Sequence, residues 1–137
     1  MSERAIDYAD TSAGDAGPAI SHPLTRTDLV MYAGASGDFN PMHHDEIAAQ
    51  KAGLPSVFGH GMFTAGLLAT AVTNFVGVGN LKSYRVRFTK QTWPGEVLTT
   101  SVTVREKRAG NEVVLDCSVV NEQGETKIQG EAVAVLP

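Results

Sequence analysis

Hydrophobic residues are densest between positions 61 and 76, where almost every side chain is apolar or small. A helix over these residues would be about 24 Å long. Its apolar positions lie all round the helix instead of along one stripe, which indicates burial on nearly every side. These positions are Met62, Phe63, Ala65, Leu67, Leu68, Ala69, Ala71, Val72, Phe75 and Val76. Such a helix, from Gly61 to about Val76, needs other elements packed around it.

The chain after residue 83 has the pattern of a sheet. Hydrophobic and polar residues alternate over 84–88 and 98–105, and the segments 113–120 and 128–136 are rich in β-branched residues. Both features are typical of strands. Turn-forming residues separate the segments: Trp93-Pro94-Gly95, Ala109-Gly110-Asn111 and Gln123-Gly124. Consecutive strands with short turns predict an antiparallel meander. One buried helix wrapped by a curved antiparallel sheet is an α+β fold.

The first part of the chain predicts shorter elements. Residues 1–17 are small, polar and acidic with little to bury, so we expect a flexible N-terminal arm. A single domain should then occupy residues 18–137. Within it, Thr25 and Asp28 have the spacing of a capping box and predict the start of a helix. A second short helix should begin at Asp45.

Composition and charge narrow the class of protein. The chain has 137 residues, of which 42% are hydrophobic and 19% charged, as expected for one soluble globular domain. Its net charge of −4 gives no global basic field, so we expect neither nucleic acid nor a membrane as partner. Residues 52–81 lack charged side chains, but Pro, His, Thr and Gly interrupt them and no apolar run has the length of a span.

The single cysteine and the N-terminal residues indicate the compartment. Cys117 cannot form an internal disulfide, which suits a reducing environment. It alternates with apolar residues, so we expect a buried strand position and not a reactive thiol. The N-terminus lacks the long apolar region of a signal peptide. We therefore expect a cytoplasmic protein.

Candidate chemistry is concentrated in the segment Gly37-Asp38-Phe39-Asn40-Pro41-Met42-His43. Gly37 and Pro41 prevent regular structure there and fix the path of a loop. Asp38 and His43 should lie on this loop, and Gly59-His60-Gly61 follows at the mouth of the long helix. A carboxylate, an imidazole and a helix N-terminus are the components of an acid–base site.

Simpler interpretations exist for each of these residues. An Asp-x-Asn-Pro sequence on its own can be only a turn, because Asp and Asn bond their own backbone. His43, His44, Asp45 and His60 could suggest a metal site. Adjacent histidines seldom point the same way, however, and no His-x-x-x-His or cysteine spacing is present. We therefore predict no metal and place His44 on the surface.

The segment from Tyr32 to His43 (Tyr-Ala-Gly-Ala-Ser-Gly-Asp-Phe-Asn-Pro-Met-His) resembles the signature of the MaoC-like, or (R)-specific enoyl-CoA hydratase, family. His60-Gly61-Met62 and Pro94-Gly95-Glu96 also match that family. The resemblance covers about residues 20–136 and implies the hotdog fold. Two further segments look closest to the catalytic subunit of two-subunit (3R)-hydroxyacyl-ACP dehydratases. They are Pro23-Leu24-Thr25-Arg26-x-Asp28-Leu29-Val30 and Tyr84-x-Val86-Arg87-Phe88-Thr89.

The family resemblance implies hydration of trans-2-enoyl thioesters to (3R)-hydroxyacyl thioesters, or the reverse dehydration. Asp38 and His43 match the family's acid–base pair, and which of them is the base is left open. The Gly61 N–H matches the donor that stabilises charge on the thioester oxygen. Asn40 should fix the loop and His60 should support the site. No cofactor is implied, because coenzyme A or phosphopantetheine enters as part of the substrate.

Substrate-binding residues and partners are less specific. Phe58 and Met62 could line an acyl tunnel or belong to the core. Arg87, with Arg85 and Lys90, could meet the phosphates of an acyl-CoA or acyl-ACP, or simply face solvent. The resemblance implies a homodimer, or a heterodimer with another hotdog subunit. A hotdog thioesterase and a non-catalytic partner subunit are alternative functions, and acyl chain length, carrier, direction and pathway stay open.

Overall fold

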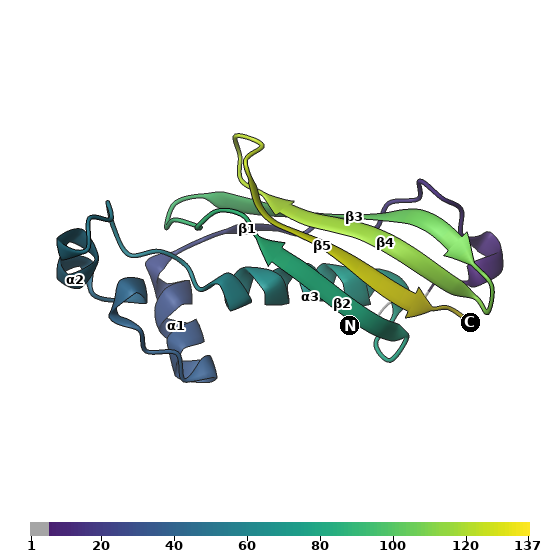
Figure 1. Ribbon diagram of the computed structural model, residues 1–137, viewed down its shortest axis with the longest axis horizontal. Helices are drawn as coiled ribbons and strands as arrows, with labels where there is room; N and C mark the ends of the chain where they lie inside the picture. Colours follow the sequence, from purple (N-terminus) through teal and green to yellow (C-terminus); the bar gives the residue numbers. More distant parts are fainter. Residues whose placement is uncertain (1–5) are drawn as a thin grey trace.

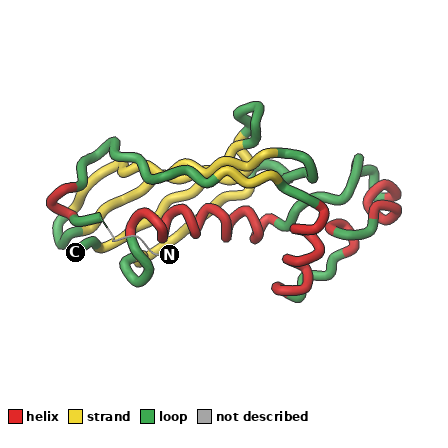
Figure 2. The backbone as a smooth tube through the Cα atoms, turned by 180° about the vertical axis from the view of Figure 1, so that it is seen from behind, coloured by secondary structure: helices red, strands yellow, loops and turns green. Residues whose placement is uncertain are grey.

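One long helix lies against a five-stranded antiparallel sheet (Figure 1). The computed structural model describes residues 6–137. Helix α3 (Gly61–Val76) runs along one face of the sheet, as the view from behind also shows (Figure 2). Helices α1 (Arg26–Ser36) and α2 (Glu46–Lys51) lie beyond the end of the sheet where α3 begins (Figure 1). The predicted α+β architecture is confirmed.

Helix α3 has the bounds that its hydrophobic pattern predicts. Leu68, Val72 and Val76 are fully buried among residues of the sheet. The helix ends at Gly77, whose φ of 93° suits glycine. At its start His60 gives no side-chain cap. The Phe63 N–H donates to the His60 carbonyl at 3.1 Å. The Gly61 N–H before it keeps its hydrogen-bonding capacity, because the first turn of a helix has no internal acceptors.

The sheet contains β1 (Ser21–Pro23), β2 (Leu81–Phe88), β3 (Val97–Arg108), β4 (Glu112–Val120) and β5 (Thr126–Val135). Its strand order is β1-β3-β4-β5-β2. Strands β3, β4 and β5 are consecutive neighbours, as a meander requires. The prediction for β2 was wrong: it pairs with β5, so the connection 89–96 crosses over the ends of β5 and β4 to reach β3. Alternation identifies strands but carries no information about their order.

The segment before β1 is attached to the sheet. Residues 1–5 of the expected arm lie outside the described residues. From residue 6 onward the chain forms a short 3-10 turn at Tyr8–Asp10 and then follows β3. Gly14 and Gly17 donate to the carbonyls of Val104 and Val102 at 2.8 and 2.9 Å. The described part of the arm thus has fixed hydrogen-bond partners, and the boundary at residue 18 stays a prediction.

Helix α1 begins with the capping box that the sequence indicates. The Thr25 hydroxyl accepts from the Asp28 N–H at 3.1 Å, and the Asp28 carboxylate accepts from the Thr25 N–H at 2.9 Å. Gly37, with a φ of 76°, ends the helix in a left-handed conformation. The helix therefore ends directly before Asp38.

No helix within residues 6–137 combines the length and hydrophobicity needed to cross a membrane.

Cys117 should resist thiol reagents until the protein unfolds. It is buried on β4, and burial, with the nearby charges of Asp116 and Glu131, raises its pKa to about 11. At pH 8 about one thiol in a thousand would be ionised, and thiolate is the reactive form. We expect almost no reaction with a chromogenic disulfide at pH 8 and full reaction in denaturant. Rapid labelling of the folded protein would contradict this.

Candidate active site

The loop between α1 and α2 is shaped by its own short polar side chains. Asn40 accepts a hydrogen bond from the Met42 N–H at 3.1 Å, and Asp38 accepts one from the Asn40 N–H at 3.3 Å. Pro41 starts a single 3-10 turn that ends at His43. Asn40 thus contacts backbone, the type of contact expected for a residue that fixes the loop. The turn carries His43 inward while Asp38 stays at the surface.

Asp38 and His43 are brought together as the sequence predicts. Asp38 Oδ2 lies 3.9 Å from His43 Nε2, and the two side chains are 52% and 8% exposed. That distance is too long for a direct hydrogen bond. His43 Nδ1 is 2.6 Å from the carbonyl oxygen of Phe58. Because a carbonyl only accepts, Nδ1 carries the proton, and in the neutral ring Nε2 presents its lone pair to Asp38.

His60 lies directly against this pair. Its ring stacks on His43 with centroids 3.9 Å apart and an interplanar angle of 28°. His60 Nε2 is 3.1 Å from the backbone oxygen of Asp38, so it donates there. Tyr32 covers the ring with a centroid distance of 4.9 Å. The buried His60 therefore contacts both the Asp38 backbone and the His43 ring, the position of a supporting residue.

Gly61 begins α3 beside these groups. A Cβ on this residue would lie 2.9 Å from the ring of Phe88, so a side chain there would displace that ring. Glycine leaves its N–H accessible at the positive end of a 16-residue helix. A partial positive charge from such a donor stabilises an oxyanion that approaches it. An acid–base pair and an oxyanion donor thus flank the same helix end.

A cavity of about 340 Å³ opens next to Gly61. It is lined by Phe58, Gly59, Gly61, Thr64, Phe88, Thr89, Lys90, Gln91, Thr92 and Lys127. Among residues 6–137, the buried hydroxyls of Thr64 and Thr92 have no hydrogen-bond partner. Of the three substrate-binding predictions, only Phe58 lines this cavity. Met62 is 61% exposed on the surface of α3.

Arg87 is separated from the cavity by the sheet. Tyr84 on the same strand donates to the Ala65 carbonyl of α3 at 2.7 Å, so odd-numbered residues of β2 face away from α3. Arg87 and Arg85 line an open groove of about 840 Å³ on that outer face. Arg105 in the same groove is paired with Asp116 and Glu131. The structure does not bring Arg87 together with Asp38 and His43.

The cluster of Asp38, His43 and His60 has the composition of a metal site but not the geometry. One potential ligand atom from each lies within 4.8 Å of the other two. A metal ion lies close to the plane of each imidazole that binds it, about 2.0–2.1 Å from the nitrogen. Two rings stacked at 3.9 Å cannot both direct a lone pair at one ion, and His60 Nε2 already donates to Asp38. The arrangement is therefore unsuited to a shared ion.

Two residues that contribute to this end of the sheet are not predicted from the sequence. Thr92 supplies the carbonyl that accepts the Gly59 N–H at 2.8 Å. Lys127 is almost fully buried below the cavity, although the pattern of β5 gives no sign of it. Lysine is almost never buried unpaired, and the partners of Lys127 come from other segments, so β5 itself carries no signal of its burial.

Comparisons with known proteins agree with one another. The sequence profile of the family described as "MaoC like domain" matches residues 11–125. The chain is 40% identical over 82 residues to 3-hydroxyacyl-thioester dehydratase Y of Mycobacterium tuberculosis, covering 57% of this chain and 28% of that protein. It is 26% identical over 121 residues to the (R)-specific enoyl-CoA hydratase of Rhodospirillum rubrum, covering 87% and 84%. The chain thus spans less than a third of the first relative and most of the second.

Solved structures show the same likeness. An R-hydratase from Pseudomonas aeruginosa, in its unliganded form, superposes with a TM-score of 0.89 at 29% sequence identity. The match covers 97% of this chain and 86% of that one. The likeness therefore includes the sheet, α3 and the loop that carries Asp38 and His43.

Proposed function

Since the chain belongs to the family of MaoC-like domains and has its hotdog fold, we propose that it interconverts trans-2-enoyl and (3R)-hydroxyacyl thioesters. One observation supports this most directly. The Asp38 carboxylate faces the His43 Nε2 lone pair across 3.9 Å, beside the free N–H end of α3. Hydration of an enoyl thioester requires both a proton-transferring pair and stabilisation of an enolate oxygen.

In the proposed reaction the thioester carbonyl accepts a hydrogen bond from the Gly61 N–H. A water molecule lies between Asp38 and His43, and its oxygen forms a bond to C3. The pair takes one proton from that water as negative charge moves to the thioester oxygen. The same pair returns a proton to C2, so one water is added and both side chains end unchanged. Dehydration follows the same steps in reverse.

A second subunit is part of this proposal. Asp38 is half exposed in the single chain, and large apolar side chains next to it in sequence or at the start of α3 also face solvent. They include Phe39, Met62 and Phe88. Strand β2 is an edge strand, whose outer backbone groups are available for pairing. We propose a homodimer or a heterodimer of hotdog subunits that covers this surface, and size-exclusion chromatography with light scattering would measure it.

The function is tested with the purified chain and two substrates, crotonyl-CoA and a longer trans-2-enoyl-CoA. We expect loss of the ultraviolet absorbance of the conjugated thioester and formation of an (R)-3-hydroxyacyl product, identified by chiral chromatography. Release of free thiol would instead indicate a thioesterase. Absence of any turnover with CoA and ACP thioesters, alone and with a candidate partner subunit, would refute the proposal.

A further inference from the structure

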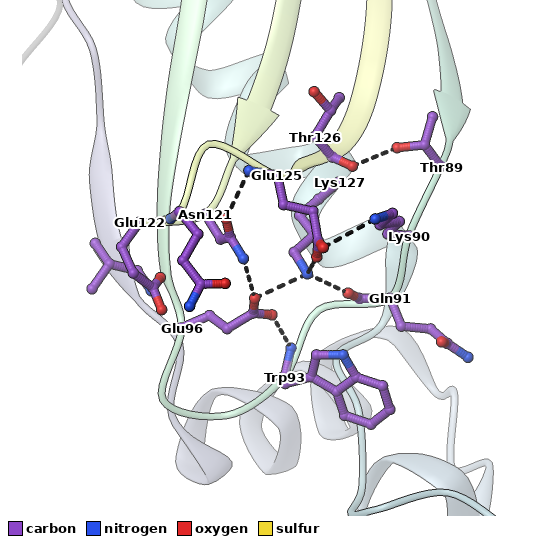
Figure 3. A network of polar contacts seen from close by, with 12 residues as sticks. Thr89, Lys90, Gln91, Trp93, Glu96, Asn121, Glu122, Glu125, Thr126 and Lys127 are labelled. Carbon is purple, nitrogen blue, oxygen red and sulfur yellow. Dashed lines mark hydrogen bonds and ion pairs between the residues drawn. The ribbon is translucent and has the colours of Figure 1, made fainter.

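Lys127 is buried near the start of β5, at the edge of the cavity. Its ammonium group is surrounded by acceptors (Figure 3). The residue is only 2% exposed. Its Nζ lies 2.9 Å from the Gln91 carbonyl, 2.6 Å from Glu125 and 2.9 Å from Glu96. An ammonium group has three donors, so these three acceptors satisfy it. Burial lowers the pKa of Lys127, but the bonds to Glu125 and Glu96 outweigh it and raise the pKa overall.

The acceptors of Lys127 come from two different parts of the chain. Gln91 and Glu96 belong to the crossover, which we define as residues 89–96, and Glu125 belongs to the turn before β5. Glu96 also accepts from the Trp93 N–H at 2.6 Å and from the Asn121 amide at 2.7 Å (Figure 3). The lysine and its partners therefore attach the crossover to the ends of β4 and β5.

A short path leads from the crossover to the catalytic groups. Next to Gln91, the Thr92 carbonyl accepts from the Gly59 N–H at 2.8 Å. Gly59 follows Phe58, whose carbonyl oxygen lies 2.6 Å from His43 Nδ1. Trp93 also meets the Phe58 ring edge-on, with centroids 5.9 Å apart. Three hydrogen bonds and two covalently adjacent residue pairs thus connect the Lys127 ammonium to the His43 ring.

Close packing makes this path mechanically stiff at one point. A Cβ on Gly59 would collide with the Thr92 side-chain hydroxyl, and the Gly59 N–H also bonds the Thr92 carbonyl, so there is no free space between these two residues. A shift of the crossover would therefore move Phe58 and Gly59, and with them the Nδ1 partner of His43 and the start of α3. Buried ion pairs contribute little net stability compared with apolar replacements, and a positional role is one reason for such a pair to be present.

We propose that Lys127 is a positioning residue, which holds the crossover so that Phe58 and Gly59 place His43 and the Gly61 N–H. The proposal rests on the function given above for these two groups. It assigns Lys127 no contact with the reacting atoms. Loss of the Lys127 ammonium should therefore lower kcat more than it changes KM. It should also weaken the hydrogen bonds along the path.

The test compares Lys127→Met, which keeps the length of the side chain, with wild type. We expect kcat to fall roughly tenfold with KM nearly unchanged, because small misplacements of catalytic groups slow the chemical step. Exchange of the Gly59 amide hydrogen should accelerate at least about tenfold, since its acceptor on the crossover is released. Lys107→Met is the matched control: this lysine of β3 donates to the Tyr8 carbonyl, far from the path described above, and kcat should not change.

Glu96→Gln provides a second variant if Lys127→Met does not fold, because it keeps the size of the side chain and removes one charge from the network. The proposal is overturned if Lys127→Met or Glu96→Gln folds with unchanged kcat and unchanged Gly59 exchange. An equal loss of kcat in Lys107→Met would also overturn the proposal, because the loss would then reflect a general effect on stability and not the position of Lys127. Hydrogen exchange needs no substrate. If the wild-type chain has no hydratase activity but Gly59 exchange is still faster in Lys127→Met than in wild type, only the proposed function is refuted.

Discussion

Asp38→Asn is expected to lower kcat/KM for hydration of an enoyl thioester by about 10²–10⁴-fold. The amide cannot accept a proton from water, whereas the carboxylate can. The substitution leaves the loop intact, because an asparagine oxygen can still accept from the Asn40 N–H that Asp38 now binds at 3.3 Å. The loss should therefore be in chemistry and not in folding. Initial rates with crotonyl-CoA, together with a thermal unfolding curve, measure both.

Asp45→Asn is the control for this variant. Asp45 caps α2 by accepting from the Ala48 N–H at 3.1 Å, and asparagine caps a helix about equally well. It lies on the same segment as Asp38 but has no part in the proposed chemistry, so its activity should equal wild type. An Asp38→Asn chain with full activity in its complex would show that this subunit does not carry the acid–base pair. That result would favour the alternative function, in which this chain is a non-catalytic partner subunit.

Local features were the ones that the sequence could predict. The capping box depends on two residues three positions apart, Thr25 and Asp28, and it forms as expected. Helix α3 depends only on its own apolar residues, and its bounds agree with the structure. Asp38 and His43 also lie on one short loop, which Gly37 and Pro41 predict, and the family resemblance implies that they act as a pair. These interactions need no knowledge of distant segments.

Features that join distant segments could not be read from the same patterns. The position of β2 beside β5 depends on where the crossover passes, and no residue of β2 itself encodes that. The attachment of residues 14–17 to β3 is made by backbone groups, which any sequence has. Lys127 looks like a strand residue until its partners from the crossover and the β4–β5 turn are in place.

In the candidate site too, local contacts could be predicted from the sequence and contacts between distant segments could not. The approach of Asp38 to His43 follows from the loop, but the stacking of His60 on His43 depends on how α3 meets that loop. Arg87, with Arg85 and Lys90, was a candidate for phosphate binding because it is basic, and exposure to solvent on the outer strand face was the alternative. Phe88, the next residue along β2, packs at the start of α3. Alternation along β2 places the two on opposite faces, so proximity in sequence does not give proximity to the cavity.

Gly61→Pro is expected to remove the oxyanion donor while keeping the helix. Proline is accepted at the first position of a helix, and it has no N–H. The preceding residue, His60, already has φ −63° and ψ 131°, the extended conformation that a following proline requires. Loss of one such donor typically costs about 10²–10³-fold in kcat, or about 2.7–4 kcal/mol. Steady-state kinetics with crotonyl-CoA would measure it.

Gly61→Ala separates this loss from a steric effect. Alanine adds the same Cβ, which would lie 2.9 Å from the Phe88 ring, but it keeps the N–H. The Phe88 side chain is half exposed and can turn away, so we expect the alanine variant to lose only a few-fold in kcat/KM, roughly 1 kcal/mol or less. The ratio of the two variants then removes the effect of the added Cβ and reports the replacement of the N–H by the proline ring. If both fold, by circular dichroism, and their kcat values agree within about threefold, the Gly61 N–H does not stabilise the transition state.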